Sequence, residues 1–318
     1  MNPNQTGKAF EAIVLEYLIQ ALKSKGISAK YTLGALEIQE ICIKFFNDLS
    51  DNVKNKKYHS DFISNTPKLV EWIINYFELN LSETVIIHKF KDSEANKNVA
   101  DLQLKVAYNG TDKVINLSLK NNHDALKHSR IGPVPTWLGF TKNDVEYIEY
   151  TNELKVAREK IKDRLTKLSH DNNISIINYK DINLINTTDD NYSTKYKNKY
   201  IYPEFYQVIK NFMENKIQNK EYANLLFHYL MSEPHYKIIN VKKEFKIYDF
   251  TSIPNASSAT IDIDSKNGYL FLHFNNGYII KIRLHNDKSE ILKSFNYKCD
   301  ITLFSPDESN IKKFILTK

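Results

Sequence analysis

Cysteine and glycine are scarce in this chain, and each shortage excludes a class of site. The two cysteines in 318 residues, Cys42 and Cys299, form no spacing motif, so a structural zinc site built from cysteines is excluded. Eight glycines form no glycine-rich loop that could cradle a phosphate or a dinucleotide. Gly-x-Ser-x-Gly and His-Glu-x-x-His motifs are also absent, so serine-hydrolase and zinc-protease chemistry have no support.

Long apolar runs are missing too. No run approaches the roughly 20 residues that a membrane span needs, and the N-terminus lacks the basic-then-apolar pattern of a secretory signal. Together with the low cysteine content, this predicts a cytoplasmic protein in a reducing compartment. The net charge of +6 suits a polyanionic partner, but many basic proteins bind none. Support for such a partner therefore depends on where the charged residues lie.

Apolar residues make up 42% of the chain, which is typical of a globular protein, and 318 residues allow one large domain or two modest ones. Three amphipathic helices and then a short strand are expected in the first part of the chain. They are predicted at 7–22, 33–50, 66–80 and 84–90, with a polar loop at 50–60. Thr66 is expected at the N-cap of the third helix and Pro67 at its first helical position. Helices followed by strands predict an α+β fold, in which a mixed sheet carries helices packed on it.

The stretch 98–130 reads as a β-hairpin with one polar and one apolar face. Asn109-Gly110 is a strong signal for a two-residue turn, because a type I′ turn needs positive φ at both positions. In that register Asp101 lies opposite Ser118, with Lys120 one position further along the same face. A longer turn would shift the register, and an ordinary solvated hairpin face has the same pattern.

Basic residues and further strands follow the hairpin. A basic segment at 121–130, a charged helix at 143–168, a polar linker or DNA-ordered loop at 181–200 and helices within 203–231 are expected. From Tyr236 onward, short alternating strands predict an antiparallel β-meander in a second sheet or subdomain. Its strand 278–285 places Lys281, Arg283 and His285 on one face, as a basic ladder that could contact phosphates or groove edges or simply be solvated.

Asp101, Lys120 and the helical Glu11 are the residues that can carry chemistry. A hard divalent cation held by carboxylate oxygens can polarise a phosphodiester and activate water, while an ammonium group positions water or stabilises charge. Glu11 has an ordinary alternative role as a solvated acid in the first turn of its helix, favoured by the helix dipole. The residues therefore fit metal-dependent phosphodiester hydrolysis, among other interpretations.

Asp101, Ser118-Leu119-Lys120 and the upstream Gly7-Lys8-Ala9-Phe10-Glu11 resemble the PD-(D/E)XK nuclease superfamily. More closely, SLKNNHDALKHSR and NNGYIIKIRLHNDKSEI resemble segments of the HaeIII-type family of type II restriction endonucleases. The resemblance implies a Mg²⁺-dependent enzyme that cuts double-stranded DNA at GGCC, giving blunt ends. It also implies a companion DNA methyltransferase and a possible homodimer.

The resemblance also implies roles for residues. Asp101 and Glu11 would hold Mg²⁺, Lys120 would orient the attacking water, and Ser118 would hydrogen-bond a metal-bound water. A phosphate clamp or base-reading set would comprise His123, Lys127, His128 and Arg130, with Lys281, Arg283 and His285 as further DNA contacts. It implies a restriction-endonuclease-like core with a helical insertion at 1–180, and a DNA-recognition region of helix and β-meander at 181–318.

The sequence departs from the superfamily pattern at two positions. Ala100 replaces a proline, and Ser118 stands where a second strand carboxylate is usual, so one metal ligand is missing unless Glu11 supplies it. Two alternatives therefore stay open. The chain could be a different nuclease of the same fold, such as a repair or resolving enzyme, or a non-catalytic DNA-binding protein whose site has decayed.

Overall fold

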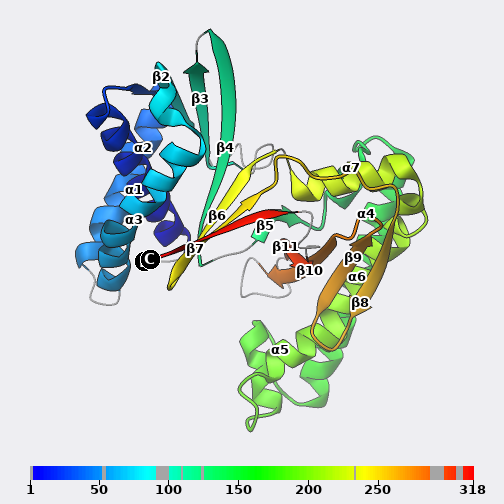
Figure 1. Cartoon of the computed structure of the whole chain (residues 1–318). Coiled ribbons are helices and arrows are strands. Elements are labelled where there is room, and N and C mark those ends of the chain that lie inside the picture. The colour runs from blue at the N-terminus through cyan, green and yellow to red at the C-terminus, as the bar shows by residue number, and fades with distance from the viewer. Residues whose placement is uncertain are drawn as a thin grey trace. The chain divides into compact units, whose positions relative to one another are not determined.

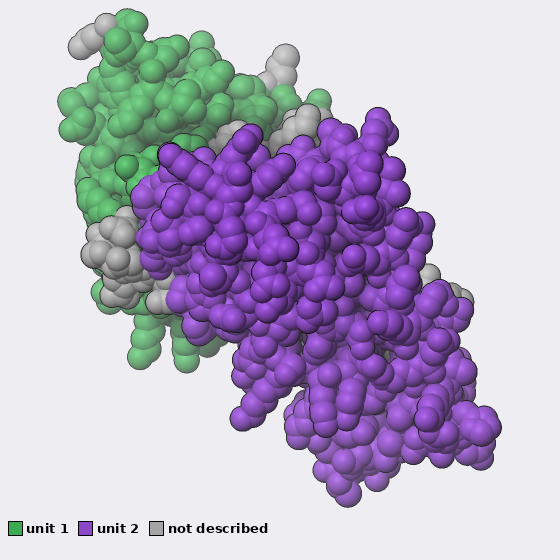
Figure 2. Space-filling model, turned by 90° about the vertical axis from the view of Figure 1, so that its right-hand side faces the viewer, with its two compact units in different colours: residues 1–124, 233–253, 309–318 green, residues 125–232, 254–308 purple. Residues whose placement is uncertain are grey.

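In the computed structural model the chain forms two compact units, and each has its own sheet (Figure 1). Figure 2 shows the two units in different colours. The described residues are 3–51, 55–90, 100–108, 110–122, 125–232, 234–286, 297–305 and 311–318. Unit 1 comprises Met1–Asp124, Glu233–Ile253 and Ser309–Lys318, and unit 2 comprises Ala125–Ser232 and Pro254–Glu308. This division differs from the predicted boundary at 180/181, because the chain returns to unit 1 twice after leaving it.

Three helices pack on one face of the unit 1 sheet (Figure 1). They are α1 (Pro3–Ser24), α2 (Leu33–Asp51) and α3 (Lys56–Tyr76). The predicted apolar stripe of the first helix is confirmed, since Phe10, Val14 and Leu18 are fully buried in the core. No helix in the described part of the chain is both long enough and apolar enough to span a bilayer.

The third helix begins well before the predicted start, so the expected loop at 50–60 is largely wrong. Pro67 lies inside α3 and not at its first turn. The buried positions Phe62 and Leu69 lie on either side of Pro67, so packing against the core holds the helix together through it. Pro67 is itself exposed, so its ring lies on the solvent side of the helix and not in the core.

The sheet of unit 1 has the strand order β1-β2-β3-β4-β6-β7-β12. The strands are β1 (Ser28–Tyr31), β2 (Thr84–Lys89), β3 (Leu102–Tyr108), β4 (Thr111–Asn121), β6 (Tyr236–Val241), β7 (Glu244–Asp249) and β12 (Lys312–Thr317). β1 runs parallel to β2 and β4 parallel to β6, and the other neighbours are antiparallel. The predicted α+β class with a mixed sheet is therefore confirmed. The predicted antiparallel meander in a second sheet is confirmed for the strands within 259–305, but the strands at 236–249, which were assigned to it, belong to this first sheet as β6 and β7.

The predicted register of the hairpin is confirmed. Tyr108 pairs with Thr111 across the turn, and Leu102 pairs with Leu117. Asp101 directly precedes β3, and its N–H donates to the carbonyl of Leu117 at 2.9 Å. Asn109 lies outside the described residues. This register brings Asp101 against Ser118.

Unit 2 contains an antiparallel sheet of five described strands in the order β5-β11-β10-β9-β8. The strands are β5 (Ala125–Arg130), β8 (Ala259–Asp264), β9 (Tyr269–Phe274), β10 (Ile279–Asn286) and β11 (Tyr297–Ser305), and the main helices are α4 (Val145–Asp171), α6 (Tyr202–Met213) and α7 (Lys220–Met231). Ile280, Ile282 and Leu284 are fully buried, which confirms the predicted apolar face of the strand at 278–285.

The segment predicted as a linker or loop at 181–200 is instead mostly helical. It forms a 3₁₀-helix at Tyr179–Ile185, α5 at Tyr192–Tyr196 and a π-helix at Lys197–Ile201. Its polar side chains satisfy the backbone of these short helices. Asp181 accepts hydrogen bonds from the N–H groups of Ile177 and Asn178, at 2.9 and 2.6 Å. Composition predicted a loop because such capping residues also dominate turns.

Candidate active site

Asp101 and Lys120 form an ion pair on adjacent strands of unit 1. Lys120 Nζ lies 3.0 Å from Asp101 Oδ2 and 3.2 Å from Oδ1, so the ammonium group spans the carboxylate. The two side chains are 24% and 20% exposed, which leaves them in reach of a ligand while much of their surface is desolvated. The hairpin register is the local cause of the pair, because it places the two residues on the same face.

Ser118 and the backbone fix the orientation of the Asp101 carboxylate. The N–H of Leu119 donates to Asp101 Oδ2 at 2.6 Å, and Ser118 Oγ donates to the same oxygen at 3.3 Å. Ser118 is fully buried, so its hydroxyl depends on this partner. A carboxylate at position 118 would instead place two negative charges side by side, so the serine makes the metal-free site easier to fold.

A second ion pair lies beside the first and involves a residue that sequence reasoning missed. Lys89 Nζ, at the end of β2, lies 3.3 Å from Glu11 Oε2 on α1. The Lys89 side chain is only 1% exposed, and its Nζ has no hydrogen-bond partner among the described residues. The missed signal was the alternation of Val85, Ile87 and Lys89, which puts a lysine on the helix-covered face of the strand.

The charges of the two ion pairs influence one another. Burial, followed by the negative charge of Asp101, raises the pKa of Glu11 to about 7, although Lys89 and Lys120 act in the opposite direction. Burial by itself lowers the pKa of Lys120, but the carboxylates of Asp101 and Glu11 outweigh it, and the pKa lies above its usual value. Two carboxylates and two ammonium groups therefore form one cluster that is neutral when all four are ionised.

The residues of this cluster fit a Mg²⁺ ion. Within the described ranges, no group of three or more His, Cys, Asp or Glu side chains is arranged to hold a metal. Mg²⁺ does not need such a cage, because it keeps several waters and takes one or two carboxylates together with substrate phosphates. Among the described residues, Asp101 Oδ1 accepts a hydrogen bond from Lys120 at 3.2 Å, and Glu11 meets Lys89 through Oε2 at 3.3 Å. Asp101 and Glu11 could therefore share a hydrated Mg²⁺.

The described residues among those predicted to bind DNA at 121–130 lie on different faces of β5. His123 lies outside the described residues. Lys127 points to the opposite side of β5 from His128 and Arg130, toward the interior of unit 2, so these three side chains do not share one face of the strand. Lys127 Nζ lies 3.6 Å from the ring centre of Tyr229, and burial lowers its pKa to about 8. Strand alternation, which the segment 121–130 was not expected to have, separates these neighbours in sequence.

His128 and His285 meet on one face of the unit 2 sheet, where both flank Asp300. Their Nδ1 atoms lie 2.7 and 3.1 Å from the two oxygens of the Asp300 carboxylate. Burial alone would raise the pKa of Asp300, but hydrogen bonds from the two histidines outweigh it and hold that pKa well below its usual range. Arg283 pairs with Asp300 in the strand register and is exposed on the same face.

Comparison of the chain with protein-family models, with curated proteins and with solved structures gave no match. The geometry of the site and the properties of its residues are therefore the basis for assigning a function.

Proposed function

We propose that this protein is a Mg²⁺-dependent endonuclease that hydrolyses phosphodiester bonds of double-stranded DNA. The observation that carries the proposal is the pairing of Asp101 with Lys120 at 3.0 Å on adjacent strands, with the Glu11 carboxylate beside them. The resemblance to HaeIII-type restriction endonucleases narrows the proposal to a type II restriction enzyme that cuts at GGCC and leaves blunt ends. Such an enzyme acts in the cytoplasm beside a DNA methyltransferase, and a palindromic target suits a homodimer.

Each residue of the cluster has a role in this reaction. Asp101 and Glu11 would hold the cation, which when bound polarises the phosphoryl group and lowers the pKa of water. Lys120, already beside Asp101, would orient the attacking water or stabilise the negative charge that develops on the phosphoryl oxygens. Ser118 and the N–H of Leu119 hold Asp101 in one orientation, so little reorganisation is needed when DNA arrives.

The test is incubation with plasmid DNA and Mg²⁺, followed by mapping of the cut ends. We expect a discrete fragment pattern with wild-type protein and none in EDTA. Asp101→Asn and Lys120→Met should each lower cleavage by at least about a hundredfold, because charge stabilisation and water positioning are lost. Asp112→Asn and Lys113→Met are matched controls on exposed positions near the turn of the same hairpin. Full activity of either site variant, or equal losses in the controls, contradicts the site assignment.

One observation favours a second candidate, a DNA-binding protein that does not cut. Ser118 occupies a position where a nuclease of this kind usually has a carboxylate, and in the structure it hydrogen-bonds Asp101. This candidate predicts salt-dependent DNA binding without any Mg²⁺-dependent product. Random nicks or cuts confined to branched DNA would instead indicate a repair or resolving nuclease. The plasmid experiment separates these outcomes from a sequence-specific fragment pattern.

A further inference from the structure

The outer face of the unit 2 sheet carries a row of aromatic rings beside a row of cations. On β9, Tyr269, Phe271 and His273 are partly exposed and alternate with residues buried in the unit. The strand register pairs Tyr269 with Arg283 and Phe271 with Lys281 on the neighbouring β10. Because paired residues of adjacent strands point to the same face, the rings and the cations form one surface.

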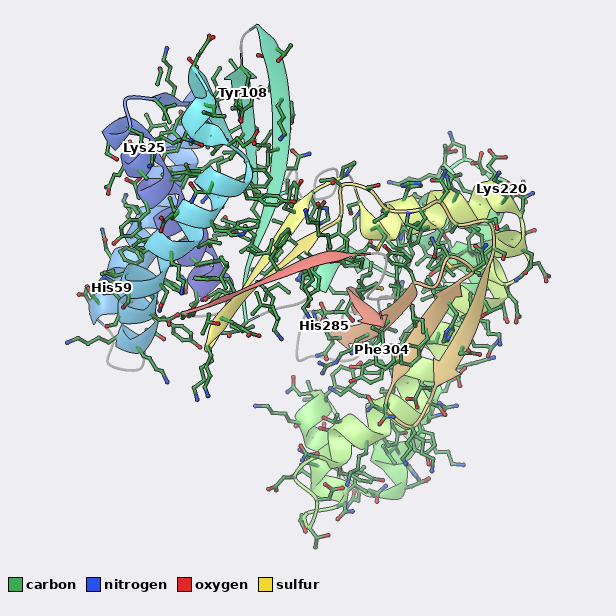
Figure 3. The ribbon with its side chains drawn as sticks, viewed as in Figure 1. Lys25, His59, Tyr108, Lys220, His285 and Phe304 are labelled. Carbon is green, nitrogen blue, oxygen red and sulfur yellow. The ribbon has the colours of Figure 1, made fainter. Side chains whose placement is uncertain are left out.

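Phe304 on β11 completes this surface on the other side of Lys281. Its ring is 56% exposed and lies 5.0 Å from the ring of Phe271. Lys281 Nζ lies 5.1 Å from the ring centre of Tyr269 and 5.5 Å from that of Phe304. Figure 3 labels Phe304 and also His285, which belongs to the adjacent strand β10. A surface on which exposed aromatic rings lie beside cations offers a ligand both a flat apolar area and positive charge.

The cations of this surface are not neutralised by the acids near them. Asp300 is engaged by His128 and His285, and Asp262 lies 3.1 Å from His273. Within the described residues, neither Lys281 nor Arg283 forms an ion pair with a carboxylate. Arg283 also lies near Lys197 of the π-helix. Burial and then the Arg283 charge lower the pKa of Lys197. Asp300 lies opposite Arg283 on the same face, but its carboxylate is engaged by the two histidines, so Lys281 and Arg283 remain available to an anionic ligand.

The aromatic rings determine which form of nucleic acid suits this surface. Five strands about 4.8 Å apart span about 19 Å, which is wider than the roughly 12 Å major groove of B-DNA. A duplex exposes only the edges of its bases in the grooves, so the flat faces that stack on these rings are most accessible where the bases are unpaired. Stacking on an aromatic ring is independent of sequence, because every base has a flat π-face.

We propose that this face of unit 2 binds an unpaired polynucleotide strand, with bases stacked on Phe304 and Phe271 and phosphates held by Lys281 and Arg283. The proposal is independent of cleavage by unit 1. It differs from the expectation that the basic ladder of β10 contacts the groove edges of a duplex, because here the bases are unpaired and stack on the protein. Single-stranded DNA and RNA both have the required chemistry, so the experiment includes one of each.

The test measures fluorescence anisotropy of labelled oligo(dT), oligo(U) and a blunt DNA duplex, all in EDTA so that no cleavage can occur. At least one single strand should bind more tightly than the duplex. Phe304→Ala should weaken that binding about tenfold, and Phe304→Tyr should retain it, because one stacked base contributes about 1–3 kcal/mol. Val156→Ala is the matched control, since Val156 is also 56% exposed but lies on α4.

The dependence of binding affinity on salt concentration distinguishes stacking on the rings from attraction to the cations. Lys281→Ala and Arg283→Ala should each reduce the slope of log affinity against log salt by about 0.7, because each removes about one phosphate contact. Phe304→Ala should leave the slope unchanged. An unchanged unfolding midpoint shows that the variants are folded, and Phe304→Trp adds a direct measurement, quenching of the new indole by the oligonucleotide. Tighter binding of the duplex, or equal affinity of Phe304→Ala and Val156→Ala, overturns the proposal whatever the plasmid assay shows.

Discussion

Lys89 Nζ lies 3.3 Å from Glu11 Oε2 in a position where the lysine is almost completely buried. The Lys89 ammonium group attracts the Glu11 carboxylate, but the burial of that carboxylate has the larger effect on its pKa. Glu11 in turn is the carboxylate that Asp101 would need as a partner in holding a divalent cation. The charge of Glu11 therefore has one role in the stability of unit 1 and another in the proposed chemistry.

Glu11→Gln should stabilise the metal-free protein at pH 8 and change it little at pH 5. The folded-state pKa of about 7 lies above the usual value of 4.5, so between these values the folded protein binds more protons than the unfolded chain. The contribution of protonated Glu11 to stability is therefore lost as pH rises toward 7, by an amount on the order of 3 kcal/mol. Glutamine stays neutral and avoids this loss.

Thermal unfolding in EDTA at the two pH values measures this effect. Glu37→Gln, at an exposed position on α2, is the control and should show no pH-dependent gain. A lower unfolding midpoint for Glu11→Gln at pH 8 than for wild type would mean that the pair with Lys89 outweighs burial, contrary to the pKa of Glu11.

Lys89 and Glu11 should be energetically coupled at pH 8 and much less at pH 5. The double-mutant cycle of Glu11→Gln and Lys89→Met isolates the interaction of the two side chains, and coupling between contacting residues is about 0.5–3 kcal/mol. At pH 5 the Glu11 carboxyl is protonated, since its pKa is about 7, and the charge–charge attraction is absent. Denaturant unfolding of the four proteins at both pH values supplies the energies. Additive effects at pH 8 would show that the 3.3 Å ion pair contributes nothing.

Ser118→Asp should make the stability of the protein depend more strongly on Mg²⁺. The new carboxylate would lie beside Asp101, where Ser118 Oγ is now 3.3 Å from Oδ2, so repulsion should lower the unfolding midpoint in EDTA. A cation that binds only the folded state restores stability by mass action. The rise of the midpoint on adding millimolar Mg²⁺ should therefore be larger for Ser118→Asp than for wild type. Asn116→Asp, two residues earlier on β4, is the control. An equal Mg²⁺ response in both variants would argue against a cation site at Asp101.

The hairpin was predictable because the residues that determine it lie close together in the sequence. Alternating residues and the Asn109-Gly110 turn fix the register, and the register alone brings Asp101 to Ser118 and Lys120. The pairing of β4 with β6 was not predictable, because it joins segments distant in sequence and no local pattern in either segment specifies the partner. The capped helices within 181–200 were missed because Asp and Asn favour turns and helix starts alike.

The same distinction between local and distant contacts explains which parts of the site could be predicted. Lys89 is buried and paired with Glu11 because a helix covers its face of β2. No pattern within 84–90 specifies that helix. The approach of His128 and His285 depends on the strand order β5-β11-β10, which places Asp300 between them. Sequence reasoning therefore identified the residues of each local element. It could not identify partners that only the packing of distant elements supplies.

Asp300→Asn should destabilise unit 2 at neutral pH, with a loss that shrinks in acid. The folded-state pKa of Asp300 lies below the value of an unfolded aspartate, so its contribution is present above about pH 4 and is lost as pH falls. Hydrogen bonds to a charged group contribute about 1.5–3 kcal/mol, and asparagine keeps the shape without the charge. Asp262→Asn is the matched control, because Asp262 also faces a histidine at 3.1 Å but is 70% exposed, where such pairs contribute little. Thermal unfolding of both variants at pH 7 and near pH 3 measures the difference, and equal behaviour of the two would show that the paired histidines do not stabilise the Asp300 carboxylate.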